Sequence, residues 1–204
     1  MEPRGIDRPT GRPRRLIVAL SGSTGPHYGV RLLEALRAHT DVEIHVILSS
    51  AARKTIAYEM GRDPDEVAAL AHELHDEKNI GASIASGTFV TDGMVVAPCS
   101  IKSLSAIANS FNDNLIARAA DVCLKERRRL VLVVRETPLH LGHLRLMQQA
   151  TEAGAVILPP APAFYHLPKT IDEIVDHTVV KILDQFGLHL DTIRRWQGLP
   201  PPTR

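Results

Sequence analysis

Five runs of aliphatic residues alternate with amphipathic stretches along the chain. The aliphatic runs cover residues 15–20, 42–48, 93–98, 130–134 and 155–160. They are continuous rather than alternating with polar residues, which indicates strands that are covered on both faces. The stretches that follow them have helical periodicity and cover residues 29–39, 49–60, 101–111, 114–128, 140–154 and 170–187. This order predicts one parallel sheet with right-handed crossovers, a doubly wound α/β fold of the flavodoxin or Rossmann kind.

Small and polar residues follow each aliphatic run. These segments read SGSTG at 21–25, SS at 49–50, PCSIKS at 98–103, RETP at 135–138 and PPAPAFYH at 159–166. Because doubly wound sheets bind ligands at the carboxyl ends of their strands, we expect the five segments to meet at one edge and form a site there.

Two of these segments are suited to an anion. SGSTG offers backbone N–H groups and hydroxyls at the start of a helix, where the helix dipole favours negative charge. Its glycine spacing does not match GxGxxG, and no Lys-Ser/Thr pair makes a P-loop. A tight strand–helix turn with a serine cap is the simpler interpretation of this segment alone. Because Ser100 and Ser103 open a second helix in the same way, one nucleotide bound by both becomes the stronger interpretation.

Charged residues near the same edge are the candidate reactive groups. Arg118, Asp121 and Lys125 are spaced to share one helical face, and taken alone this pattern favours a solvated face with an internal ion pair. Arg135 and Glu136 follow a buried strand directly, at the usual position of functional residues in this class of sheet. Tyr165 follows the last strand in the same way.

Length and composition indicate one globular domain. The 204 residues carry a formal net charge of +1, which gives no reason to expect nucleic acid or an anionic membrane as a partner. No apolar run is long enough to span a bilayer. We expect a flavodoxin-like domain over residues 15–188 and a C-terminal tail over 189–204. Residues 1–14 are basic and proline-rich, and we expect a disordered leader there, with a weak arm for an anionic partner as the alternative.

Cysteine and histidine usage argues against two further kinds of chemistry. Cys99 and Cys123 lie in apolar segments and form no disulfide framework, as expected of a reduced, cytoplasmic protein. Neither cysteine lies beside a histidine that would activate it as a nucleophile. His72 and His75 do not form an HExxH motif, and His140 and His143 have no carboxylate pattern near them. We therefore expect no metal site.

Four longer segments together resemble the flavin prenyltransferase family, the UbiX-type proteins once described as small subunits of aromatic acid decarboxylases. They are SGSTGPHYGVRLLEAL, APCSIKSLSAIA, NLIARAADVCLKERRRLVLVVRETPL and ILPPAPAFYHLP, and the resemblance runs from about Arg15 to Trp196. It implies a flavodoxin-like fold and a homododecamer with active sites between subunits. It also implies that reduced FMN and dimethylallyl phosphate react without a metal to give prenylated FMN, the cofactor of a UbiD-type decarboxylase.

The resemblance also implies roles for individual residues. Those that match the family's FMN site are Gly22, Ser23, Thr24, Ser49, Ser100, Ile101, Lys102, Ser103 and Arg135. Those that match the group around the prenyl phosphate are Arg118, Lys125, Glu136, Tyr165 and Lys181. Glu59 matches a glutamate that assists proton movement near the flavin. The chemistry is coherent, because cations stabilise a departing phosphate and Glu136 is suited to protonate it.

Two other functions remain open from the sequence. An FMN-dependent cysteine decarboxylase would share the fold, but it carries an active-site histidine and a PxMNxxM-type segment, and no such segment occurs here. A module that stores prenylated FMN without making it would need fewer cations than this chain carries around Glu136.

Overall fold

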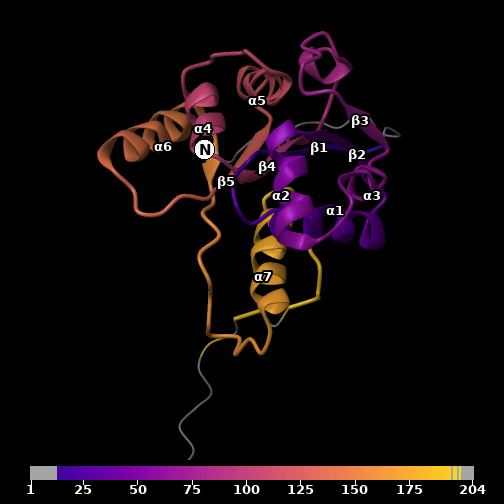
Figure 1. Ribbon diagram of the computed structural model, residues 1–204, viewed down its shortest axis with the longest axis vertical. Coiled ribbons are helices and arrows are strands. Elements are labelled where there is room, and N and C mark those ends of the chain that lie inside the picture. Colours follow the sequence, from indigo (N-terminus) through magenta and orange to yellow (C-terminus); the bar gives the residue numbers. More distant parts are fainter. Residues whose placement is uncertain (1–12, 194, 197, 199–204) are drawn as a thin grey trace, which may run out of the picture.

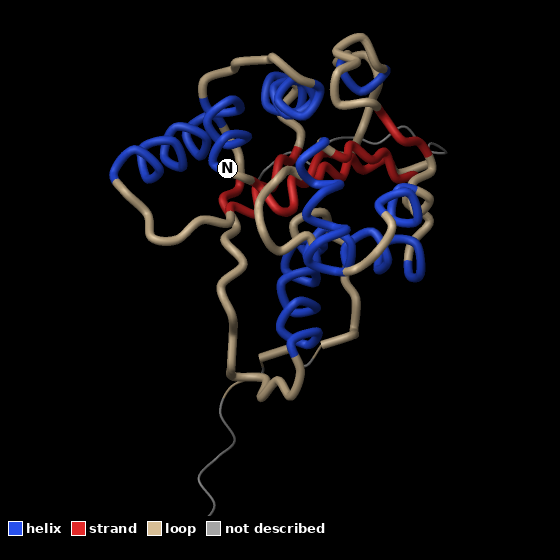
Figure 2. The backbone as a smooth tube through the Cα atoms, viewed as in Figure 1, coloured by secondary structure: helices blue, strands red, loops and turns tan. Residues whose placement is uncertain are grey.

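The computed structural model describes residues 13–193, 195, 196 and 198, and six parallel strands form its centre (Figures 1 and 2). The sheet has the order β3-β2-β1-β4-β5-β6, and all neighbouring pairs are parallel. The strands are β1 (Arg15–Leu20), β2 (Glu43–Leu48), β3 (Glu73–His75), β4 (Gly93–Cys99), β5 (Arg129–Val134) and β6 (Val156–Ile157). The expected doubly wound parallel sheet is confirmed.

Helices cover both faces of the sheet. They are α1 (His27–His39), α2 (Ser50–Met60), α3 (Pro64–Ala68), α4 (Ile101–Ala108), α5 (Leu115–Lys125), α6 (Leu141–Ala153) and α7 (Ile171–Asp184), with a short 3-10 helix η1 (Ser83–Ala85). One apolar cluster packs α1, α2, α3 and α7 against one face. A second cluster packs η1, α4, α5 and α6 against the other. In Figure 1, α4, α5 and α6 accordingly lie on the side of the sheet opposite α7.

The continuous aliphatic runs are explained by these two clusters. Successive side chains of a strand point to opposite faces, so Leu16 and Val18 of β1 join one cluster while Ile17 and Ala19 join the other. All four are almost completely buried. A strand with helices on both sides therefore has no position at which a polar residue would face water.

Several element boundaries differ from the sequence prediction, each for a local reason. The last strand is only Val156–Ile157 rather than 155–160, because the prolines that follow lack the N–H needed for the sheet. Helix α5 ends at Lys125 rather than at 128, and Arg127 takes a positive φ of 56° there. The edge strand β3 was not predicted, because its three residues include a glutamate and a histidine and form no aliphatic run.

Both ends of the described chain lie against α7. Arg14 donates a hydrogen bond from Nη2 to the backbone oxygen of Phe186 at 2.5 Å. In the tail, Arg195 pairs with Asp184 at 2.9 Å, and the Trp196 ring packs edge-on against Tyr165 at 5.6 Å between centroids. Residues 1–12 of the expected leader lie outside the described residues, so their disorder stays a prediction. Within the described part, no helix is long and apolar enough to cross a membrane.

Both cysteines are free thiols inside the core, and burial raises the pKa of each to about 12. A thiol with such a pKa has almost no thiolate at neutral pH, and the thiolate is the reactive form. We therefore expect iodoacetamide to leave Cys99 and Cys123 unmodified in the native protein and to modify both in denaturant, as measured by intact mass. Rapid alkylation of either cysteine under native conditions would contradict this packing.

Candidate active site

The chain reverses its direction of winding between β1 and β4, and the buried hydroxyl of Ser21 joins the two strands at that point. Ser21 follows β1 directly and is 2% exposed. Its Oγ donates to the backbone oxygen of Pro98 at 2.8 Å and accepts from the backbone N–H of Ser100 at 2.8 Å. Doubly wound sheets bind ligands at this point of the fold, and the region at the carboxyl ends of β1 and β4 is here called the crevice. Sequence reasoning missed Ser21 as a functional residue, although it is the first residue of SGSTG.

The loop after β1 also lies directly against the start of α2. A Cβ atom added to Gly22 would come within 2.3 Å of the Ala51 Cβ atom, so only glycine fits here without displacement. At the same place Ser49 caps α2, because its hydroxyl accepts from the Ala52 N–H at 3.0 Å. The predicted residues Gly22, Ser23 and Ser49 therefore share one small region.

The start of α4 completes this edge. Ser100 is the N-cap, and its Oγ accepts from the Ser103 N–H at 3.2 Å. The predicted stretch Ser100–Ser103 therefore forms the first turn of α4, with Ile101 partly buried and Lys102 exposed. Two helix N-termini, those of α2 and α4, flank the loop after β1, and such termini stabilise a bound phosphate.

Arg135 leaves β5 beside the same loop. Its backbone oxygen accepts from Ser23 Oγ at 3.0 Å, and its N–H donates to the Cys99 oxygen at 3.1 Å. Tyr28 of α1 is half-buried next to it: burial raises the pKa of Tyr28, and the positive charge of Arg135 offsets part of that rise. The side chain of Glu136, one residue further, is exposed and accepts from the Thr137 N–H at 3.0 Å.

Glu59, in the last turn of α2, reaches back to the loop after β1. Its Oε2 accepts from the Thr24 hydroxyl at 2.9 Å and from the Gly25 N–H at 2.9 Å. The two residues that the sequence resemblance assigned separately, Thr24 and Glu59, are therefore in direct contact. A carboxylate held in this way adds a proton acceptor at the rim of the crevice.

The predicted phosphate-binding residues of α5 lie on the other side of the sheet from α7. Arg118 pairs with Asp121 at 3.3 Å, as their spacing predicted, and its Nε donates to the Ala85 oxygen at 3.1 Å. Lys125 pairs with the adjacent Glu126 rather than with Asp121. Each cation is therefore held by an acidic neighbour, Asp121 within α5 for Arg118 and Glu126 directly after α5 for Lys125.

Tyr165 and Lys181 are associated with α7. The Tyr165 hydroxyl lies 2.7 Å from Nε2 of His177, which is one helical turn before Lys181. Burial lowers the pKa of His177, and the nearby charges of His166 and Lys181 lower it further. Because α5 and α7 lie on opposite sides of the sheet in Figure 1, one copy of the chain does not bring the predicted phosphate-binding residues together.

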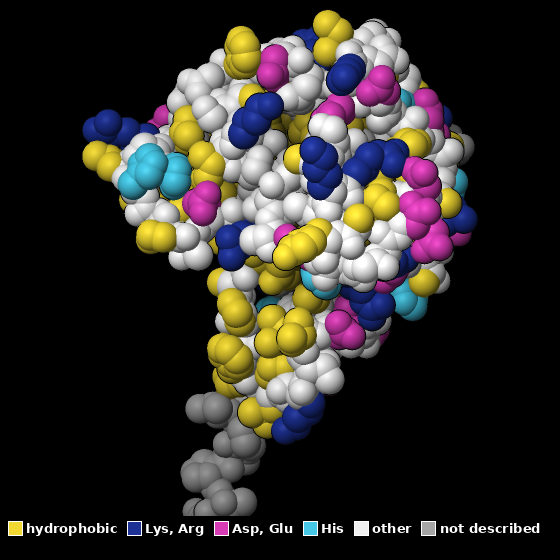
Figure 3. All heavy atoms as spheres, in the orientation of Figure 1, with side chains coloured by type: hydrophobic (Ala, Val, Ile, Leu, Met, Phe, Trp, Pro, Cys, Tyr) yellow, Lys and Arg dark blue, Asp and Glu magenta, His cyan; other side chains and the backbone are white. Residues whose placement is uncertain are grey.

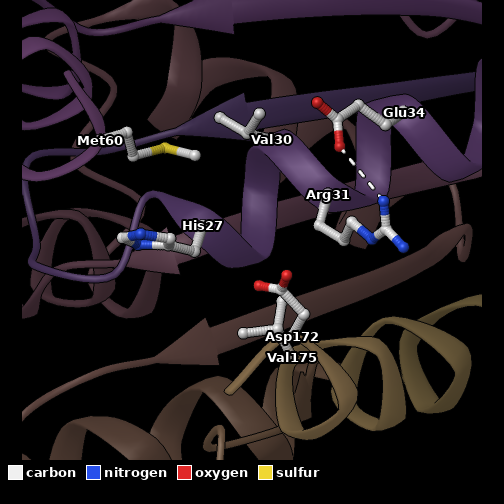
Figure 4. A pocket seen from close by; sticks show the side chains of 7 residues that line it. All are labelled: His27, Val30, Arg31, Glu34, Met60, Asp172 and Val175. Atoms are coloured by element: carbon white, nitrogen blue, oxygen red, sulfur yellow. Dashed lines mark ion pairs between the residues drawn. The ribbon is translucent and has the colours of Figure 1, made fainter. Parts of the chain in front are cut away.

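A surface pocket between α1 and α7 is lined by none of the candidate site residues described above (Figure 4). It is lined by His27, Val30, Arg31, Glu34, Met60, Asp172 and Val175, none of which the sequence analysis assigned to a site. The charge of Arg31 is already neutralised, because it pairs with Glu34 at 3.5 Å and with Asp176 at 2.6 Å. The crevice between β1 and β4 therefore remains the candidate active site.

Comparison with known proteins identifies the family of the chain. The family model described as Flavoprotein matches residues 7–183. The flavin prenyltransferase UbiX of Thauera aromatica is 59% identical over 184 residues, which cover 90% of this chain and 94% of that protein.

Solved structures of UbiX and UbiX-like proteins also superimpose closely on this chain. A UbiX protein in complex with FMN and dimethylallyl pyrophosphate superimposes with a TM-score of 0.91 at 49% identity, covering 93% of this chain and all of that one. A dodecameric FMN-dependent UbiX-like decarboxylase from Escherichia coli superimposes with a TM-score of 0.88 at 49% identity, covering 90% of this chain and all of that one. A peptidyl-cysteine decarboxylase is only 17% identical, with a TM-score of 0.57 and 74% of this chain covered, which shows a shared fold alone.

The contact of Gly22 with α2 generates a prediction. Gly22→Ala should lower the free energy of unfolding by about 1–3 kcal/mol, because the new methyl group overlaps Ala51. The double variant Gly22→Ala/Ala51→Gly should regain part of that loss in urea unfolding. Gly81→Ala is the control, since its nearest neighbour lies at an ordinary 3.5 Å. Equal stability of Gly22→Ala and the wild type would contradict the close approach.

Proposed function

Because the chain belongs to the UbiX family of flavin prenyltransferases, we propose that it transfers a dimethylallyl group from a dimethylallyl phosphate to reduced FMN. The observation that carries this proposal is the crevice between β1 and β4, where two helix N-termini and a hydroxyl-rich loop meet. The product is prenylated FMN, and we propose that a UbiD-type decarboxylase receives it.

The residues of the crevice fit FMN. The N-termini of α2 and α4 and the hydroxyls of Ser23 and Thr24 suit its phosphate, and Gly22 leaves the backbone accessible to it. Arg135, half-buried beside them, supplies a fixed positive charge. Reduced FMN provides the nucleophilic N5 and C6 positions that accept the prenyl group.

The remaining residues act on the prenyl donor. Arg118, Lys125 and Lys181 neutralise the phosphate while its bond to the allylic carbon breaks, and the Tyr165 hydroxyl donates to it. Glu136 gives a proton to the departing phosphate. Glu59, hydrogen-bonded to Thr24 at 2.9 Å, accepts a proton at the flavin end of the site. Lys181 lacks the two-pronged geometry of arginine, so it binds the phosphate as a point charge.

We propose that another copy of the chain completes this site, in a homo-oligomer that is a dodecamer. The start of α7 and the segment before it are too apolar to face water alone, because Phe164, Leu167 and Ile171 are 67%, 66% and 77% exposed. Hydrophobic side chains gather over this lower part of the molecule in Figure 3. Burying them between copies brings Tyr165 and Lys181 of one chain to the α5 cations of another, and it excludes water from the allylic cation.

The two free thiols suit the reducing cytoplasm, which we propose as the compartment.

The proposed activity is tested by mass spectrometry of the flavin. Purified protein is incubated without oxygen with reduced FMN and dimethylallyl phosphate, and separately with the pyrophosphate, and the flavin is then extracted. We expect FMN that is heavier by one five-carbon prenyl unit. Unmodified FMN with both donors, from protein that binds the flavin, would contradict the proposal and favour a flavin carrier.

Glu136 can be tested separately from flavin binding. Glu136→Gln removes the acidic group that donates a proton to the phosphate but preserves the size of the side chain. The prenylation rate should therefore fall by about 10²–10⁴-fold, while FMN affinity stays the same. Glu152→Gln, which changes an exposed glutamate of α6, is the matched control. Undiminished prenylation by Glu136→Gln would rule out its role as the proton donor.

A further inference from the structure

Two histidines and a glutamate come together at the edge of the sheet, away from the crevice. His45 of β2 is paired in register with Glu73 of β3, and His75 lies two residues further along β3. All three side chains therefore point to the same face of the sheet. The side chain of His45 is fully buried and that of His75 is 5% exposed, whereas that of Glu73 is 52% exposed and reaches solvent.

Two of the three distances between the donor atoms are close to those of a metal site. Nδ1 of His45 lies 3.0 Å from Nε2 of His75 and 3.4 Å from Oε2 of Glu73. A tetrahedral zinc ion bound at ordinary distances keeps its ligand atoms about 3.3 Å apart. Within the described residues, one donor atom from each of the three side chains lies within 4.8 Å of the other two. The Glu73 side chain is half exposed, so rotation toward His75 on metal binding would close the remaining gap.

A neighbouring carboxylate orients the central histidine. Nε2 of His45 lies 3.1 Å from Oε1 of Glu43, and Glu43 is itself held by Nε of Arg15 at 2.8 Å. When Nε2–H donates to Glu43, Nδ1 carries the lone pair and faces Glu73 and His75. Carboxylates hold the ring of metal-binding histidines in this way in known sites. Phe89 packs edge-on against the His45 ring at 5.2 Å and fixes it further.

We propose that His45, Glu73 and His75 bind one zinc ion. Two imidazoles and one carboxylate are a donor set that zinc accepts, and the fourth position faces the solvent beside Glu73, where water can bind. No metal was expected from the sequence because these three residues form no short motif, since His45 is 28 residues before Glu73. This site is independent of the proposed prenyl transfer.

Zinc bound to these residues would link β3 to β2 at the edge of the sheet. β3 has only three residues, and the chain after it contacts two parts of the protein near the crevice. The Glu77 side chain accepts from the Ser50 N–H at the start of α2 at 2.8 Å, and its backbone oxygen accepts from the Leu115 N–H at the start of α5 at 2.8 Å. A metal that joins β2 and β3 therefore stabilises the segment that holds these two helices.

The test uses full-length protein without a polyhistidine tag, stripped of metal with a chelator. We expect equilibrium dialysis with Zn²⁺ to give one ion per chain, and Co²⁺ to give the visible absorption of a low-symmetry site with nitrogen ligands. Glu43→Gln should weaken zinc binding by about 10–100-fold, and Glu73→Gln should weaken it more. Zinc should raise the melting temperature of the wild type and leave that of Glu73→Gln unchanged.

Glu66→Gln and His39→Ala are matched controls, because both residues are exposed and lie outside the cluster. Both should bind zinc as the wild type does. Glu73 is half exposed, so its variant should fold, and its circular dichroism and FMN affinity should match the wild type. Less than one bound zinc per chain in the wild type, or the same zinc affinity in Glu73→Gln and the wild type, would overturn the proposal.

Discussion

The hydroxyl of Ser21 is the interaction on which the candidate active site depends. Ser21 follows β1 directly, and its buried hydroxyl makes two hydrogen bonds to the end of β4, one to the Pro98 oxygen and one from the Ser100 N–H. A buried hydroxyl that lost these partners would cost about 1–3 kcal/mol, so the two strand ends are held at a fixed separation. The close approach of Gly22 to Ala51 then fixes α2 against the same loop. These contacts bring the N-termini of α2 and α4 together, and this is why the edge is suited to a phosphate.

The contacts of Ser21 and Gly22 do not position the cations that we assign to the prenyl phosphate. The sheet separates α5 from α7. Helix α5 carries Arg118 and Lys125, whereas Tyr165 and Lys181 are associated with α7. A departing phosphate can meet both groups only if they come from different copies of the chain. In the oligomer that we propose, burial of the exposed apolar side chains around the start of α7 would supply the driving force for that association. The same burial that forms the oligomer would therefore complete the active site and keep water out of it.

Much of this could be predicted from the sequence, because buried parallel strands leave a strong signal. The continuous aliphatic runs gave the positions of β1, β2, β4 and β5, and the polar residues after them gave the edge at which Ser23, Ser49 and Ser100 lie. β3 left no such signal, since a short edge strand needs few apolar residues. The contacts of Ser21 and the cluster around His45 were also missed, because they join residues that are far apart in the sequence.

The central claim, that one active site takes residues from two copies, can be tested by mixing two variants. Lys125→Ala and Lys181→Ala each remove one exposed cation, one from α5 and one from α7. The two variants are produced with different tags, alone and in the same cells, and mixed oligomers are isolated through both tags. The account predicts weak prenylation by each variant alone and clearly higher activity in the mixed oligomers, in which some sites receive both lysines. Mixed oligomers no more active than the separate variants would contradict it.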